Sequence, residues 1–189
     1  VPPSLRPRHA RRHAGPRKGR IAVTLRAAVI GVGAMGRHHA RVYRESGLTE
    51  LCAVADPDEA NSGFVAERHG VPAYSDHRAM LEAVRPDLVS VAVPTAAHLT
   101  VVRDCLAAGA NVLVEKPMAA SPAEGREMIE LARSARRVLM VGHVERFNPA
   151  IIELRRRLQE GALGRVFEIR SRRMGPFPAR IRAVGVVID

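Results

Sequence analysis

The stretch Ala28–His39, AVIGVGAMGRHH, decides the fold of this chain. Its three glycines, Gly31, Gly33 and Gly36, are spaced as G-x-G-x-x-G. This pattern forms either the phosphate-cradling turn of a dinucleotide site or an ordinary tight turn between a strand and a helix. Glycine is common in loops, so the pattern alone does not separate the two interpretations. The sequence on either side of it does.

Short apolar runs alternate with amphipathic stretches along most of the chain. The predicted strands are AAVIGVG, ELCAVAD, VPAYS, DLVSVAVP, NVLVEKP and RVLMVGH. They are rich in Val, Leu and Ala with little polar alternation, which is typical of parallel strands covered on both faces. The alternation predicts an α/β fold over residues 24–142, a Rossmann-type doubly wound parallel sheet.

Capping residues mark the helices between these strands. Gly70 is predicted to end one helix as its C-cap, and Asp76 is predicted to begin the next as its N-cap. Ser121 is a third predicted cap, because Pro122 and Glu124 follow it at the first and third helical positions. The predicted helices cover residues 34–47, 57–69, 76–84, 95–108 and 121–135.

Asp56 favours the interpretation of the glycine turn as a dinucleotide site. It ends the second predicted strand, 20 residues after Gly36, which is the spacing of the dinucleotide fingerprint. In that fingerprint the backbone approaches the pyrophosphate and the acidic residue accepts hydrogen bonds from the ribose hydroxyls. A carboxylate repels a 2′-phosphate, so NAD is favoured over NADP. The predicted cofactor-binding residues of this region are Gly31, Val32, Gly33, Ala34, Met35, Gly36 and Asp56.

Two further motifs, Val93–His98 (VPTAAH) and Glu115–Pro117 (EKP), follow later strands at their carboxyl ends, where open α/β sheets bind ligands. A lysine beside a nicotinamide can move the proton that accompanies hydride transfer. The alternatives are a solvated loop lysine, a histidine that only bonds backbone at a helix start, and a glutamate paired with a neighbouring cation. The candidate cofactor-binding residues here are Val93, Pro94, Thr95, His98, Glu115 and Lys116.

The pattern changes after Gly142. FNPAIIELRRRLQEGALG predicts an amphipathic helix, and RVFEIRSRRMG predicts a longer strand with alternating character. An alternating strand belongs to a sheet with one solvated face. We therefore expect residues 143–189 to begin a second α/β domain with a one-sided, mostly antiparallel sheet that is incomplete at Asp189.

The formal net charge of +11 is concentrated in residues 1–20, which hold seven Lys and Arg residues, four prolines and no acidic residue, so the rest of the chain carries only +4. Residues 1–23 are predicted to be a disordered basic tail or an incorrectly assigned start. A basic arm for nucleic acid and a targeting peptide stay open. The tail therefore contributes nothing to the functional assignment.

Two cysteines, Cys52 and Cys105, lie far apart in apolar runs. They fit neither a redox pair nor a metal site, so we expect buried, reduced thiols in a cytoplasmic protein without a metal. No apolar run reaches the roughly 18 residues that span a bilayer, so no membrane partner is expected.

The motifs AVIGVGAMGRHHARVY, AVADPD, VAVPTAAH, EKPMA and VGHVERFNPA resemble, in order and spacing, the Gfo/Idh/MocA family of NAD(P)-dependent oxidoreductases. The resemblance implies an N-terminal Rossmann domain, a C-terminal α/β domain whose open sheet forms homo-oligomers, and oxidation or reduction of a secondary alcohol. It implies that Lys116 is the catalytic lysine and that Asp189 opens the family's D-x-x-x-H motif. The catalytic histidine of that motif would follow the last residue, so the chain alone is expected to be inactive.

The segments GHVERFNPA and RRMGPFP resemble the branch of that family that acts on nucleotide-activated sugars, in particular UDP-N-acetylglucosamine 3-dehydrogenases. The resemblance implies a substrate site that includes Arg146, Asn148 and Arg173. Arginines in the second segment and just after it fit a diphosphate. They equally fit a role in pairing with acidic groups or lining an oligomer interface, and Phe147 equally fits a staple for the following helix. The arginines in question are Arg172, Arg173 and Arg180.

These observations predict an NAD-dependent oxidoreductase that transfers a hydride between the nicotinamide and a sugar or nucleotide-sugar alcohol. Two alternatives stay open: a non-catalytic, NAD-binding regulatory module, and an inositol or other polyol dehydrogenase of the same family. No specific nucleic acid partner is expected.

Overall fold

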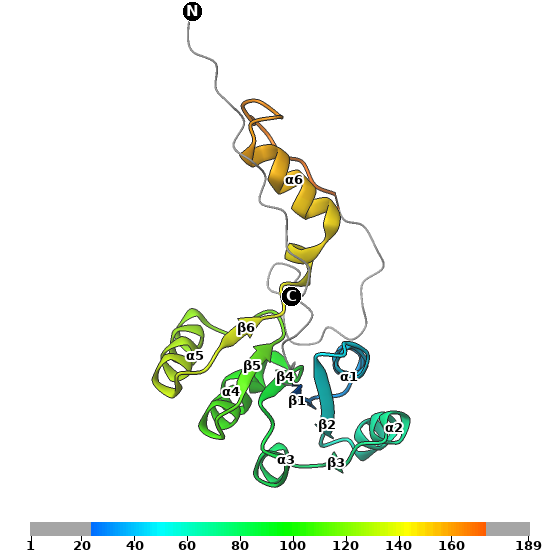
Figure 1. Cartoon of the computed structure of the whole chain (residues 1–189). Coiled ribbons are helices and arrows are strands. Elements are labelled where there is room, and N and C mark those ends of the chain that lie inside the picture. The colour runs from blue at the N-terminus through cyan, green and yellow to red at the C-terminus, as the bar shows by residue number, and fades with distance from the viewer. Residues whose placement is uncertain (1–23, 173–189) are drawn as a thin grey trace, which may run out of the picture.

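Six strands form one parallel sheet in the order β3-β2-β1-β4-β5-β6 (Figure 1). The computed structural model describes residues 24–172. The strands are β1 (Leu25–Ile30), β2 (Thr49–Ala55), β3 (Ala73–Tyr74), β4 (Leu88–Val91), β5 (Asn111–Val114) and β6 (Leu139–Val141). The helices are α1 (Gly36–Glu45), α2 (Glu59–His69), α3 (His77–Val84), α4 (His98–Ala107), α5 (Pro122–Ala135) and α6 (Pro149–Gln159), with 3-10 turns η1 (Thr95–Ala97) and η2 (Val144–Phe147).

The strand order reverses between β1 and β4. The chain runs outward from β1 through β2 to β3, then returns to place β4 on the other side of β1, and every ladder is parallel. This confirms the predicted doubly wound parallel sheet. A sheet of this kind binds ligands outside the carboxyl ends of its strands, at the point where the order reverses.

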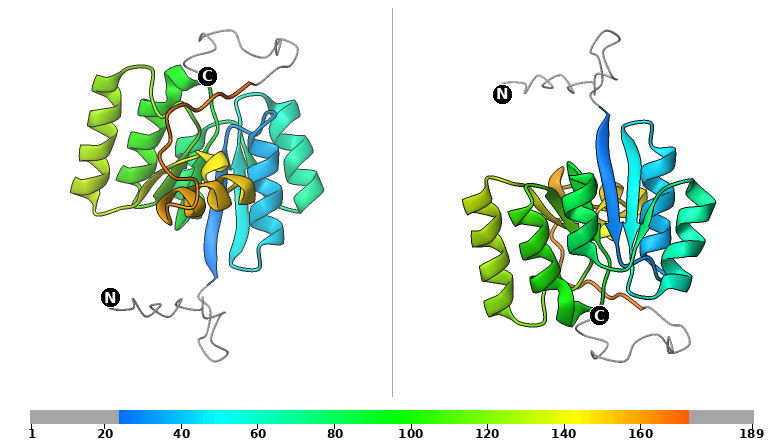
Figure 2. Two further views of the ribbon diagram at one scale, coloured as in Figure 1. Left: turned by 90° about the horizontal axis from the view of Figure 1, so that it is seen from above. Right: turned by 90° about the horizontal axis from the view of Figure 1, so that it is seen from below.

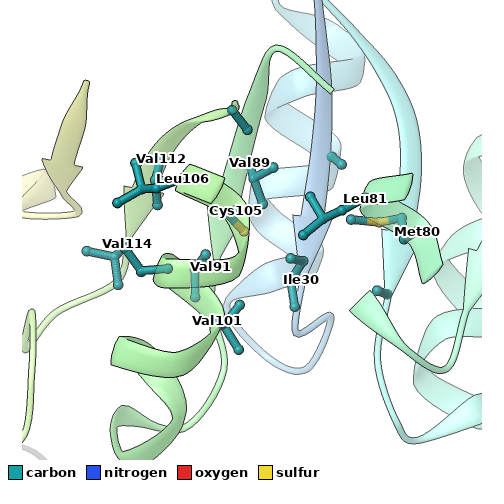
Figure 3. Packing of buried hydrophobic residues seen from close by; sticks show 14 of the residues in the cluster. Ile30, Met80, Leu81, Val89, Val91, Val101, Cys105, Leu106, Val112 and Val114 are labelled. Atoms are coloured by element: carbon teal, nitrogen blue, oxygen red, sulfur yellow. The ribbon is translucent and has the colours of Figure 1, made fainter. Parts of the chain in front are cut away.

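Helices cover both faces of the sheet, as the two views of Figure 2 show. Side chains of α1 and α2 pack with one set of β1 and β2 residues, whereas α3, α4 and α5 pack with the opposite set and with β4 and β5. Figure 3 shows the larger cluster, in which the labelled residues are Ile30, Met80, Leu81, Val89, Val91, Val101, Cys105, Leu106, Val112 and Val114. Burial of this apolar surface is the main force that holds the strand ends in place.

The predicted caps form. Asp76 accepts a hydrogen bond from the Arg78 amide, and Ser121 accepts one from the Glu124 amide. Gly70 ends α2 with a left-handed φ of 67°, a conformation that glycine adopts without steric cost. Two boundaries differ from the prediction. Helix α1 begins at the third glycine of the loop rather than at residue 34, and the helix predicted from residue 95 begins as the turn η1.

The segment after β6 departs further from the prediction. Helix α6 forms and is capped by Asn148, but none of its residues is buried, and it extends away from the sheet (Figure 1). The strand expected from Arg165 is absent over residues 165–172, which are exposed and form no ladder. A strand needs a neighbouring strand for its backbone hydrogen bonds, and none is available to it within residues 24–172. Arg173, Arg180 and Asp189 lie outside the described residues.

The remaining expectations concern cysteines and membranes. Cys52 and Cys105 are both free; Cys105 is fully buried and Cys52 partly so. Burial raises the pKa of both thiols, which keeps them protonated and unreactive. Within residues 24–172, no helix has the length and apolar character needed to span a membrane.

Candidate functional site

The glycine loop connects β1 to α1 at the reversal of strand order. Gly31 has a φ of 82°, and a Cβ built there would lie 2.7 Å from the Ala92 carbonyl carbon. A Cβ at Gly36 would lie 1.8 Å from the Gly31 carbonyl oxygen, so no side chain fits. Gly33 differs from both, because a Cβ there would meet no atom within 4 Å. The outer two glycines therefore build the loop, and the middle one leaves open space beside its backbone.

Asp56 lies at the end of β2, beside the loop. Its Oδ2 accepts a hydrogen bond from the Val32 amide at 2.8 Å, and its Oδ1 accepts one from the Asp58 amide at 2.9 Å. Each carboxylate oxygen has a further lone pair for another donor. The acidic residue predicted to bind the ribose thus holds the glycine loop through the Val32 amide.

The N-termini of α1 and α4 carry no side-chain cap and no acidic residue in the first turn, whereas α2, α3, α5 and α6 each begin with a side-chain cap. The first amides of a helix lack intrahelical partners and carry a partial positive charge. Together with the open space at Gly33, this end of α1 fits an anionic group such as a pyrophosphate. The loop residues Ala34 and Met35 are exposed here.

Arg37 is a residue of this region that sequence reasoning missed. Its guanidinium donates to the Asn61 side chain at 2.7 Å and to the Val32 carbonyl at 3.2 Å, and it lies 4.8 Å from the centre of the Phe64 ring. These contacts join the first turn of α1 to α2 beside Asp56. Its position directly after the third glycine was the only available signal.

His98 connects the two later motifs. Its Nε2 lies 3.0 Å from the Val93 carbonyl oxygen, and its Nδ1 lies 3.0 Å from the Pro117 carbonyl oxygen. The ring is 1% exposed. Both ring nitrogens therefore face backbone within the protein, which favours the alternative of a backbone-bonding histidine. Pro94 is exposed and Val93 and Thr95 are partly buried on the loop that this ring holds.

Glu115 and Lys116 follow β5 directly. Glu115 is 7% exposed and Lys116 is exposed, so neighbouring residues have opposite environments. The Glu115 carboxylate accepts hydrogen bonds from His39 Nε2 at 2.9 Å and from the Lys116 amide at 3.1 Å. The His39 hydrogen bond, opposed by burial and assisted by the Lys116 amide, holds the pKa of Glu115 below its ordinary value. Glu115 is thus an ionised, buried carboxylate, and His39 is its side-chain hydrogen-bond partner.

His39 was not predicted, and neither were its partners Ser90 and Tyr43. His39 Nδ1 lies 3.0 Å from Ser90 Oγ, which lies 2.6 Å from the Tyr43 hydroxyl. Two signals were available in the sequence. His39 and Tyr43 are four residues apart on one helix, and Ser90 interrupts an otherwise apolar strand.

The structure brings together the residues at the ends of β1, β2, β4 and β5. The proposed substrate residues are further along the chain: Arg146 belongs to η2, and Asn148 caps α6 by accepting from the Ala150 amide at 3.0 Å. Both are exposed. Asn148 therefore has a structural role in this chain in addition to any role in substrate binding. No cluster of metal-ligating side chains occurs among the described residues.

Comparisons with known proteins agree with this geometry. A model of the Gfo/Idh/MocA oxidoreductase family, described as an NAD-binding Rossmann fold, matches residues 25–143. The UDP-N-acetylglucosamine 3-dehydrogenase of Acidithiobacillus ferrooxidans is 32% identical over 167 residues, 88% of this chain and 51% of that protein. The inositol 2-dehydrogenase of Rubrobacter xylanophilus is 34% identical over 148 residues, 77% of this chain and 41% of that protein.

Among solved structures, the WlbA dehydrogenase from Chromobacterium violaceum in complex with NADH and UDP-GlcNAcA superposes with a TM-score of 0.72 at 30% identity. The superposition covers 82% of this chain and 44% of that one. The chain spans about half the length, or less, of the curated relatives it matches.

Proposed function

The chain belongs to the Gfo/Idh/MocA oxidoreductase family with its NAD-binding Rossmann fold, and we propose that it forms the cofactor-binding part of an NAD-dependent dehydrogenase of sugar alcohols. The observation that carries the proposal is the arrangement of the glycine loop. Open space at Gly33, an uncapped α1 and the Asp56 carboxylate offer a place to a pyrophosphate and to ribose hydroxyls.

Asp56 supports NAD over NADP. Its carboxylate can accept hydrogen bonds from ribose hydroxyls, and a carboxylate repels a 2′-phosphate. Arg37, the cation nearest to this region by its contacts, is engaged by Asn61, the Val32 carbonyl and the face of Phe64. Asn61 and Phe64 both belong to α2, so the guanidinium is held against that helix.

Lys116 is the proposed proton acceptor. The substrate CH–OH group loses its hydroxyl proton to the Lys116 amine as the carbonyl forms. A bound NAD would supply the acceptor for the hydride that leaves the same carbon. Lys116 is exposed at the carboxyl end of β5, on the edge of the sheet that also carries the glycine loop. Proximity of these groups, rather than binding strength, determines the rate of such a step.

The substrate class that we propose is a nucleotide-activated sugar, oxidised at C3 as in UDP-N-acetylglucosamine. Support comes from the 167-residue match, which covers 88% of the chain against 77% for the inositol dehydrogenase. The structural relative crystallised with UDP-GlcNAcA adds to it. Arg146, Asn148 and Arg173 are the proposed substrate residues, and Asp189 is proposed to act with Lys116.

Two further parts of the proposal concern the oligomeric state and the cellular compartment. Exposed apolar residues on α6, among them Ile151, Ile152 and Leu154, support a contact surface for further parts of the protein or for a second copy. We therefore propose a homo-oligomer; sedimentation of the full reading-frame product as a monodisperse monomer would reject it. The free thiols of Cys52 and Cys105 support a reducing compartment, the cytoplasm.

The first experiment is calorimetric titration of the full reading-frame product with NAD and NADP. Binding of NAD in preference to NADP supports the proposal, and binding of neither rejects it. Turnover is then followed by NADH absorbance with UDP-N-acetylglucosamine, UDP-GlcNAcA and myo-inositol as alternative substrates. Turnover with myo-inositol alone would replace the nucleotide-sugar assignment while leaving the dehydrogenase intact. NAD binding without turnover on any alcohol would favour the regulatory module.

A further inference from the structure

A chain of four polar side chains runs from helix α1 to the end of strand β5. His39 contacts Glu115 through Nε2 and Ser90 through Nδ1, and Ser90 contacts the Tyr43 hydroxyl. The side chains of His39 and Glu115 are 13% and 9% exposed, and Ser90 and Tyr43 are buried. Water is thus largely excluded from the chain. In such surroundings a hydrogen bond is strong and a missing partner is costly.

One arrangement of protons satisfies every group in this chain. The ionised Glu115 carboxylate only accepts, so His39 carries a hydrogen on Nε2. Burial raises the pKa of the Tyr43 hydroxyl, against the opposite effect of the Ser90 hydrogen bond, so Tyr43 keeps its proton. Tyr43 then donates to Ser90, and Ser90 donates to Nδ1 of His39. The chain is therefore directed from Tyr43 toward Glu115.

Glu115 extends this series of hydrogen bonds to the backbone of Lys116. Its Oε2 accepts the Lys116 amide hydrogen at 3.1 Å. On its other side the carboxylate packs against the backbone at the end of β6, where a Cβ at Gly142 would lie 3.0 Å from Oε1. Contacts from α1, from Lys116 and from β6 thus leave the carboxylate little freedom. The orientation of Glu115 in turn restrains the backbone from which Lys116 extends.

We propose that His39 is a positioning residue for Lys116, acting through the Glu115 carboxylate. The helix that carries His39 begins in the glycine loop, so one rigid element connects the proposed pyrophosphate site to the proposed proton acceptor. The inference rests on the proposed function of Lys116, and it adds to that function a residue that touches neither cofactor nor substrate.

The first test needs no substrate. In the full chain, hydrogen exchange of the Lys116 amide is measured by NMR in the wild type and in His39→Leu. Without His39, the buried carboxylate lacks its main donor and turns toward water, releasing the Lys116 amide. We expect exchange at Lys116 to accelerate about 10-fold or more relative to core amides such as that of Val112, which corresponds to about 1.4 kcal/mol of lost protection.

The second test uses turnover of the full reading-frame product. His39→Leu is expected to lower kcat about 10–100-fold, because a displacement of about 1 Å in a reacting group has effects of this size. The Kd for NAD is expected to stay within about twofold, because the His39 side chain bonds Glu115 and Ser90. Its bond to the glycine loop, at the Met35 carbonyl, is made by the backbone amide, which leucine keeps. His39→Gln, which keeps a side-chain N–H donor, is expected to recover part of kcat. His38→Leu is the matched control, since His38 is the exposed neighbour on the same helix.

The outcomes separate the two proposals. Unchanged exchange at Lys116 in His39→Leu overturns the positioning role, whatever the enzyme does. Equal acceleration at Lys116 and at core amides also overturns it, because His39 would then only support the fold. In a third outcome, exchange in His39→Leu accelerates only at Lys116, and the wild type binds NAD but oxidises no alcohol. That result rejects the proposed function and supports the structural link from His39 to Lys116.

Discussion

The Val32 amide donates to the Asp56 carboxylate at 2.8 Å, so the residue proposed to bind the ribose also holds the loop proposed to bind the pyrophosphate. The carboxylate accepts the Asp58 amide as well, at 2.9 Å. Asp56 therefore connects β2, the glycine loop and the start of α2. A change at this residue acts on cofactor affinity through two routes, which must be separated experimentally.

Asp56→Ala is expected to raise the Kd for NAD about 10–100-fold, since hydrogen bonds to a charged group contribute about 1.5–3 kcal/mol. It is also expected to narrow the preference for NAD over NADP, because the charge that repels a 2′-phosphate is gone. Calorimetric titration with both cofactors measures these effects. Glu67→Gln, which removes an exposed carboxylate from α2, is the control and is expected to change neither Kd.

Asp56→Asn separates the two routes. The amide oxygen of asparagine still accepts from Val32, whereas its amide nitrogen cannot accept from Asp58. The glycine loop is therefore expected to keep its structure while the charge is lost. If Asp56→Asn binds NAD as well as the wild type, the carboxylate serves the loop alone. That result would remove the charge-based argument for NAD over NADP.

The glycines of the loop lead to a second prediction. Gly33→Ala is expected to fold with an unchanged Tm, because its Cβ meets no atom within 4 Å, but to bind NAD at least about 10-fold more weakly if the cofactor fills that space. Gly36→Ala is expected to lose stability, since its Cβ would overlap the Gly31 carbonyl. Thermal unfolding and NAD titration measure the two effects separately.

Gly63→Ala is the control for this pair. Gly63 lies in α2, and a Cβ there also meets no atom within 4 Å. Alanine in a helix is more favourable than glycine by about 1 kcal/mol, so a small rise in Tm with unchanged NAD affinity is expected. Full NAD affinity in Gly33→Ala would show that the open space at this loop is not where the pyrophosphate binds.

The parts of this structure that the sequence could predict are those encoded locally. The glycine spacing, Asp56 at a strand end, and the caps Asp76 and Ser121 each depend on a few neighbouring residues, and the structure has them where the pattern predicted. The parallel sheet followed from the alternation of strands and helices in the same way.

The buried chain from Tyr43 to Glu115 could not be predicted by such means. His39 and Glu115 are 76 residues apart, and they meet only because α1 packs on β1 and β2 and reaches β4, beside which β5 ends at Glu115. The absent strand at residues 165–172 has a related cause. Its alternating pattern describes which side chains face a core, but a strand forms only when another strand is present to pair with it.

His98 provides a prediction on stability. His98→Leu keeps an apolar volume but removes the imidazole N–H that bonds a backbone carbonyl at Val93 or Pro117. A carbonyl left without its donor costs about 1–3 kcal/mol. For a chain of this length, each kcal/mol lowers Tm by about 2–4 °C. The loss is expected in thermal unfolding, and His38→Leu, at an exposed histidine, is expected to leave Tm unchanged. Equal Tm values for the wild type and His98→Leu would contradict the assignment of His98 as a link between the two loops.

The depressed pKa of Glu115 predicts how stability depends on pH. A carboxyl group with a lower pKa in the folded state, here chiefly because of the His39 hydrogen bond, stabilises the fold above its ordinary pKa of about 4.3. That stabilisation is lost as the pH falls through the folded-state value. Glu115→Gln, which keeps the shape without the charge, is therefore expected to have a lower Tm than the wild type at pH 7, and the difference is expected to shrink below about pH 4.

Thermal unfolding between about pH 3 and pH 7, a range that includes the ordinary carboxyl pKa, measures the difference in Tm within three pairs of proteins. The pairs are the wild type with Glu115→Gln, the wild type with Glu82→Gln, and His39→Leu with the double variant His39→Leu, Glu115→Gln. The exposed Glu82, changed to Gln, is the control, and its difference from the wild type is expected to be independent of pH. In a His39→Leu background the Glu115→Gln difference is expected to lose its dependence on pH, because the main cause of the shift is gone. A Glu115→Gln difference that stays constant with pH, or that grows toward acid, would mean that this carboxylate is not held in its ionised form by His39.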